Sequence, residues 1–161
     1  QIEKESSVDV VYLVDSFGAL YSEQIAYLAK KYIAAMPTRE IGIHAHNNQQ
    51  LAFANTIESI IQNINYLDGT IFGIGRAAGN CPLELLLGFL KNPKFNIKPI
   101  LEVLGKDFVK LQQEIEWGYT IPYMITGILD LHPRAGMKLR NSEARDEYLG
   151  FYEKLTSEAN V

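Results

Sequence analysis

A parallel α/β fold is the structure that the sequence predicts, on two observations. Apolar, β-branched runs over residues 9–15 and 40–46 suit strands of a parallel sheet that is covered on both faces, and each is followed by apolar residues at helical spacing. A third cycle begins at Tyr66, so the strands start roughly 30 residues apart, the length of one strand-helix unit. The sequence therefore predicts three consecutive parallel strand-helix units.

Each predicted element has its own local signal. The first helix begins at Ser22, a residue type that caps helices, and ends just before Pro37. The third begins at Pro82, whose missing N–H costs little in a first turn. We expect a third strand over residues 66–72 and helices over residues 22–36, 49–64, 82–90 and 99–117. The tail, residues 118–161, is expected to be helical and peripheral.

Composition excludes several classes of protein. The 161 residues are 47% hydrophobic and 21% charged with a net charge of −4, and no block of like charges could follow a phosphate backbone, which argues against nucleic-acid binding. No apolar run reaches the ~18 residues of a membrane-spanning helix. The single cysteine, Cys81, cannot form an internal disulfide, and it fits a reducing compartment, so a cytoplasmic location is expected.

The length conflicts with a complete barrel. A closed (β/α)8 TIM barrel typically takes ~250 residues, whereas three units and a helical tail fill this chain. Two architectures remain open at this point, a small open α/β domain or the C-terminal portion of a barrel. We divide the chain into the strand-helix units, residues 1–92, and a C-terminal helical extension, residues 93–161.

The sharpest chemical feature is the pair His44 and His46 at the end of the second strand. Side chains two apart on a strand share one face, so both imidazoles can reach one metal ion. Two imidazoles make an incomplete site that needs a third ligand; the alternative is a pair of hydrogen-bonded structural histidines. Asp15 and Ser16 end the first strand, where we expect them beside the histidines, although Asp15 is equally well explained as a loop or capping aspartate.

A glycine-rich loop over residues 73–79 joins the third strand to its helix. Its glycine spacing departs from the dinucleotide-binding fingerprint, so we interpret it as a tight turn beside a ligand, with Arg76 available for an anion. Asn80, just before the helix, is more often an N-cap than a catalytic group. Composition alone makes Tyr123 a core residue, and His132 is interpreted as structural, in a tail away from the strand ends.

The order of these motifs resembles the last three strands of the metal-dependent pyruvate aldolase and acyl-lyase superfamily of TIM barrels, which includes 3-hydroxy-3-methylglutaryl-CoA lyase. The likeness is strongest to the 4-hydroxy-2-oxovalerate aldolases and spans roughly residues 8–125. The segments that carry it are Asp15-Ser16-Phe17-Gly18, His44-Ala45-His46-Asn47-Asn48 with residues 51–55, Gly73-Ile74-Gly75 with residues 78–84, and Trp117-Gly118-Tyr119 to Tyr123.

The resemblance implies a divalent-metal-dependent lyase or aldolase that cleaves or forms a carbon–carbon bond of a small 2-oxo acid through a pyruvate enolate. It implies that His44 and His46 bind the metal, expected to be Mn²⁺ or Mg²⁺, while Asp15, Ser16 and Asn80 line the substrate pocket. Tyr123 would handle a proton or position the substrate. A homo-oligomer is also expected, and a dehydrogenase partner follows from the aldolase likeness.

Several family features have no match in this chain. The Asp-x-Thr-Leu-Arg-Asp-Gly segment, which supplies the third metal ligand, an arginine and the general base, is absent, so we expect the site to be incomplete without a preceding half. The tail also lacks a match to the dehydrogenase-contacting extension. Two other functions remain alternatives: an acetyl-CoA-dependent Claisen-type acyltransferase, and a non-catalytic α/β module that binds an anion.

Overall fold

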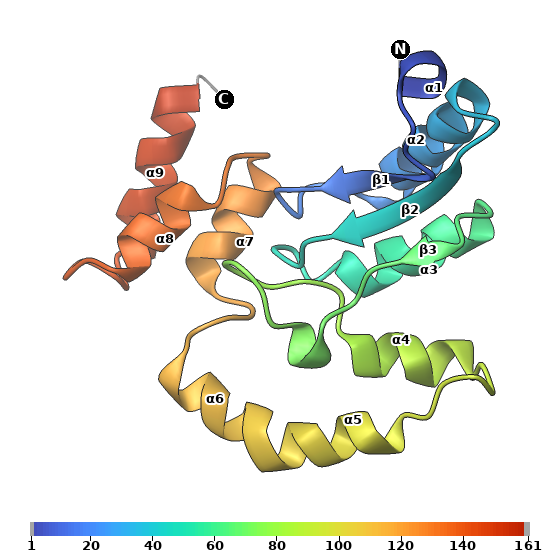
Figure 1. Cartoon of the computed structure of the whole chain (residues 1–161). Helices are drawn as coiled ribbons and strands as arrows, with labels where there is room; N and C mark the ends of the chain where they lie inside the picture. Colours follow the sequence, from blue (N-terminus) through green and yellow to red (C-terminus); the bar gives the residue numbers. More distant parts are fainter. Residues whose placement is uncertain (1, 160–161) are drawn as a thin grey trace.

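A three-stranded parallel sheet organises the computed structural model, which describes residues 2–159 (Figure 1). The strands are β1 (Val10–Asp15), β2 (Glu40–Ala45) and β3 (Tyr66–Leu67), in the order β1-β2-β3. Gln1 and residues 160–161, which the predicted domain ranges include, lie outside the described residues. The prediction of parallel α/β strand-helix units is confirmed.

The register of β1 against β2 gives the sheet two unlike faces. Leu13 pairs with Ile43, and both are buried in the core. On the opposite face Val14 pairs with His44. Because directly paired residues of parallel strands share a face, the histidines lie on the side away from the core.

Three helices pack against the core face of the sheet: α2 (Ser22–Ala35), α3 (Ala52–Ile61) and α4 (Leu83–Leu90) (Figure 1). Their apolar residues enclose one cluster with the sheet, which includes Leu13, Ile25, Ala29, Ile41, Ile43, Ile64 and Leu86. The histidine face is open, since Val14 and Tyr66 on it remain 47% and 42% exposed. We expected both faces of the sheet to be covered, but within the described residues helices cover only the core face.

The third strand is shorter than predicted. Only Tyr66 and Leu67 pair with β2, and the chain then turns into a 3-10 segment, η1 (Ile71–Gly73), in which Phe72 has a φ of +56°. The cause is a second set of partners: Thr70 N donates to Cys81 O, and Leu83 N donates to Thr70 O. Residues 70–72 therefore close the glycine loop and do not extend the sheet.

The remaining helices are α1 (Ile2–Glu5), α5 (Lys98–Val103), the π-helical η2 (Leu104–Phe108), α6 (Val109–Glu114), α7 (Ile121–Ile128), α8 (Arg134–Arg140) and α9 (Tyr148–Ala159). The predicted helix over residues 99–117 is thus interrupted by a π-helical turn. In Figure 1, α7 and α8 lie near the carboxyl ends of the strands. The tail is not peripheral throughout, because Pro122, Tyr123 and Ile125 of α7 are buried.

Contacts across residue 92 tie the helical extension to the strand-helix units. Trp117 Nε1 donates to Phe72 O at 2.9 Å, and Gly118 N donates to Ala77 O. The division at residues 92 and 93 stays a prediction. Across the described chain, no helix combines the length and the apolar character that a membrane crossing requires.

Candidate functional site

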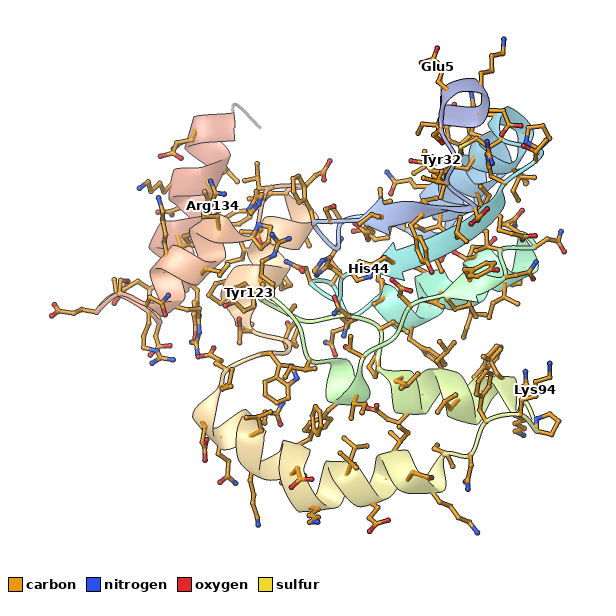
Figure 2. The ribbon with its side chains drawn as sticks, in the orientation of Figure 1. Glu5, Tyr32, His44, Lys94, Tyr123 and Arg134 are labelled. Carbon is orange, nitrogen blue, oxygen red and sulfur yellow. The ribbon has the colours of Figure 1, made fainter. Side chains whose placement is uncertain are left out.

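His44 lies near the carboxyl end of β2, on the open face of the sheet (Figure 2). His46 follows the last residue of the strand, and its ring lies beside that of His44. Their ring centroids are 5.3 Å apart and the ring planes meet at 76°. The shared face is the one that strand alternation predicts. Two imidazoles at this separation can approach one ligand from two directions.

Asp68 fixes the ring of His44. Its Oδ2 lies 2.9 Å from His44 Nδ1, and the aspartate follows β3 at the position that continues the pairing of Ile43 with Leu67. An Nδ1–H held by a carboxylate leaves Nε2 with its lone pair free, the tautomer that binds a metal. The sequence analysis did not predict a role for Asp68. Only the strand register shows that Asp68 lies beside His44, because each follows a residue of the pair Ile43 and Leu67.

Tyr12 belongs to the same face. A Cβ on Gly42 would lie 2.5 Å from Tyr12 Cε1, so the ring of Tyr12 covers the glycine that pairs with it. Burial, and then the negative charge of Asp68, raise the pKa of the Tyr12 phenol above its ordinary value. The open face therefore carries Tyr12, His44, His46 and Asp68.

The electrostatics of His46 favour the neutral ring. Burial, followed by the charges of His44 and Arg76, lowers the pKa of His46 below its ordinary value. A neutral imidazole is the form that offers a lone pair to a metal ion. His46 is thus prepared for ligation without having to lose a proton near neutral pH.

Asp15 does not join the imidazoles. It pairs with Ala45, so its side chain points to the core face, where it accepts hydrogen bonds from Ala19 N at 3.0 Å and Leu20 N at 3.2 Å. Burial outweighs these bonds and raises the pKa of the carboxyl. Asp15 thus organises the loop after β1, as a loop aspartate does, whereas Ser16, the next residue, is exposed at the strand end.

The glycine loop returns to the end of β2. His46 and Asn80 form an antiparallel bridge, and Cys81 N donates to Ala45 O. The Asn80 amide donates to Ile74 O, and it occupies the space above Gly75, where a Cβ would lie 2.6 Å from Asn80 Nδ2. Asn80 is not the N-cap of α4, a position that Pro82 takes, because its backbone is held by the bridge.

The donors present fit part of a cation site. Asn80 Oδ1 is buried and has no hydrogen-bond partner among the described residues, and its backbone pairs with His46. Two imidazole nitrogens and an amide oxygen are donors that divalent cations accept. Within residues 2–159, no three His, Cys, Asp or Glu side chains are grouped closely enough to hold a metal ion. The third acidic ligand of the resemblance is not among these residues.

Tyr123 approaches from α7 and packs against the glycine loop at Ala77 and Ala78 (Figure 2). Its carbonyl accepts a hydrogen bond from the buried amide of Asn48. Burial is the main cause that raises the pKa of the Tyr123 phenol. The charge of Glu116 raises this pKa further, and the charge of Arg140 lowers it. The ring supports the loop, while a role for the hydroxyl in proton transfer stays a prediction.

One other expectation changes in the structure. His132 does not lie away from the strand ends, because its ring is 5.4 Å from that of Phe17, directly after β1. The cause is α7, which Asn48 and Gln49 hold against the strand-end loops through hydrogen bonds to Tyr123 O and Gly127 O. Cys81 is fully buried, and burial raises the pKa of its thiol, in keeping with an inert cysteine.

Comparison with known proteins places this chain in a family. The HMGL-like family profile matches residues 3–106. A 95-residue segment is 40% identical to the 4-hydroxy-2-oxovalerate aldolase of Thermus thermophilus, over 59% of this chain and 27% of that protein. A 91-residue segment is 37% identical to the oxaloacetate decarboxylase of Mycobacterium tuberculosis, over 55% of this chain and 26% of that protein. The matches thus span only about a quarter of the length of these two relatives.

A solved structure agrees with the sequence comparisons. The N-terminal domain of a candidate aldolase from Bacteroides vulgatus superposes with a TM-score of 0.75 and 32% identity, over 88% of this chain and 47% of that one. The profile covers well over half of the chain, and the fold of this neighbour is the same. The chain belongs to the HMGL-like family.

Proposed function

We propose that this chain supplies the cation-binding histidines and the adjoining strand ends of a divalent-metal-dependent carbon–carbon lyase that acts on a 2-oxo acid. The observation that carries the proposal is the pair of adjacent imidazoles on the open face, one of them oriented by Asp68. The names of the two similar proteins given above contain the substrates 4-hydroxy-2-oxovalerate and oxaloacetate, and both compounds are 2-oxo acids.

The chain's own groups divide the work in this proposal. His44 and His46 would hold the cation, and Asn80, whose backbone bridges to His46, would offer its unpartnered Oδ1 as a further oxygen donor for cation or substrate. A divalent cation there, Mn²⁺ or Mg²⁺, supplies a Lewis acid for the carbonyl of the 2-oxo acid. Ser16 lies exposed at the end of β1, where it can contact the substrate, and Tyr123 positions the glycine loop.

The experiment measures product release by the gene product that carries this chain. With Mn²⁺ present, we expect pyruvate from 4-hydroxy-2-oxovalerate or from oxaloacetate, and the second product, aldehyde or carbon dioxide, separates aldol cleavage from decarboxylation. Chelation should abolish the release. The His46→Ala variant should lose it by orders of magnitude while keeping its circular dichroism spectrum, because the change removes a ligand and not part of the core. Thiol release from acetyl-CoA without cleavage of either acid would contradict the proposal.

A further inference from the structure

A cationic cleft lies between the glycine loop and α8, outside the residues assigned above to the cation. Its volume is about 530 Å³, and its lining consists of Arg76, His132, Arg134, Met137, Lys138 and Asn141. We propose that this cleft binds an oxyanion, the phosphate or carboxylate end of a small molecule. The further step, that this molecule is the substrate of the neighbouring site, rests on the proposed function.

The charge of the cleft is the first argument. The chain as a whole has a net charge of −4, yet the described lining contains three permanent cations and no acidic side chain. None of the three forms an ion pair with another described residue. An oxyanion would receive charge-assisted hydrogen bonds from all three.

Helix α8 shows that these cations are left unpaired selectively. Arg134 and Lys138 are four residues apart on this helix, so they share one face, where like charges destabilise a helix. Arg140 on the same helix has acidic partners, Glu116 and Asp146. The fold thus neutralises one cation of α8 and leaves the two that line the cleft available for a ligand.

His132 adds a further hydrogen-bond donor. Its Nδ1 accepts a hydrogen bond from Arg134 N at 3.0 Å, which places the ring proton on Nε2. The ring is also held by its edge contact with Phe17. An Nε2–H on a fixed ring is a directional donor for an oxyanion in the cleft.

The cleft adjoins the open face through Arg76. The Arg76 Nη2 donates to Ser16 O at 3.2 Å, at the end of β1. The loop that carries Arg76 also accepts a hydrogen bond from Asn47 N through Gly79 O. A molecule anchored in the cleft by an oxyanion would therefore extend toward the histidines.

The test titrates the chain with inorganic phosphate and, separately, with acetate at constant ionic strength, followed by amide chemical shifts in NMR spectra. We expect saturable shifts at residue 76 and residues 132–141, and a loss of affinity of about tenfold or more in the double variant Arg134→Gln/Lys138→Gln. Both side chains are exposed and the variant removes a like-charge pair, so it should unfold at or slightly above the wild-type midpoint. The control Lys30→Gln, an exposed lysine of α2, should bind as the wild type does.

The outcomes are separable. Tighter binding of phosphate than of acetate identifies a phosphorylated ligand, and the reverse identifies a carboxylate. Equal weakening in the Lys30 control, or shifts spread over the whole surface, would overturn the cleft as a site. In the gene product, the double variant should raise KM at unchanged kcat for 2-oxo acid substrates that carry a second anionic group. An unchanged KM alongside lost phosphate binding would overturn only the assignment to the substrate.

Discussion

Asp68 Oδ2 lies 2.9 Å from Nδ1 of His44, and this contact joins two neighbouring strands at their carboxyl ends. The pair is not deeply buried, with side chains 29% exposed for the histidine and 45% for the aspartate. In so open a position the ion pair itself contributes little to stability. Its effect is on the direction and tautomer of the imidazole, and so on the affinity of any cation that the ring binds.

Asp68→Asn should therefore weaken cation binding without unfolding the chain. The amide still accepts or donates one hydrogen bond but no longer enforces the Nδ1–H tautomer, and loss of such a partner lowers metal affinity by about 10- to 100-fold. Titration calorimetry with Mn²⁺ on the gene product measures the change. Asp107→Asn, at an exposed aspartate of η2, is the matched control. Equal affinities for the Asp68 and Asp107 variants would contradict the role of Asp68.

The lowered pKa of His46 predicts a pH dependence of stability. In the unfolded chain an imidazole takes up its proton near pH ~6.5, whereas burial and the nearby charges of His44 and Arg76 delay this in the folded chain. Between the two pKa values the unfolded state binds more protons, so the free energy of unfolding falls as the pH drops below 6.5 and levels off below the folded pKa.

This dependence is measured against His46→Gln, which lacks the titrating ring. Urea unfolding at pH 7.5 and at successively lower pH values should show wild-type stability declining relative to the variant. An NMR titration of the His46 ring in the same chain gives the folded pKa directly. A midpoint at or above 6.5 would contradict the prediction.

Two glycines should respond oppositely to alanine. Gly79 has a φ of +78°, and a Cβ there would clash with Gly73 O, so Gly79→Ala should destabilise the chain by more than about 1 kcal/mol and displace the glycine loop. Gly88 lies inside α4, where a Cβ meets nothing within 4 Å, so Gly88→Ala should stabilise by about 0.5–1 kcal/mol. Thermal or urea unfolding of both variants measures the contrast. Equal destabilisation by Gly79→Ala and Gly88→Ala would show that the backbone of the glycine loop does not specifically require glycine at position 79.

Strand patterns alone predicted β1, β2 and the shared face of the two histidines. The partner of His44 was not predicted, because Asp68 reaches it only through the strand register, which sequence periodicity does not provide. For the same reason Asp15 was expected beside the histidines, although its pairing with Ala45 turns it to the core face.

Long-range contacts explain the other differences. The third strand ends early because residues 70–83 bond to each other across the glycine loop. His132 reaches Phe17 because buried Asn48 and partly buried Gln49 hold α7 over the strand ends, and polar residues in a loop give no local sign of such a role. Elements set by residues adjacent in the sequence were therefore predictable, and those set by contacts between separate segments of the chain were not.

The open face of the sheet predicts association of the 161-residue chain. In the described chain β1 pairs with β2 alone, so its outer edge presents unpaired backbone groups, and Val14 and Tyr66 expose apolar surface on the histidine face. Unpaired strand edges and apolar faces of this kind promote pairing with other chains. We expect concentration-dependent association in analytical ultracentrifugation, and a smaller sedimentation coefficient for Val14→Lys, which places a charge on that face. Val109→Lys, at an exposed residue of α6, is the control.

The 161-residue chain should release no pyruvate from 2-oxo acids, because its described residues include two adjacent imidazoles but no carboxylate grouped with them as a metal ligand. A stable monomer with full metal-dependent lyase activity would contradict both expectations.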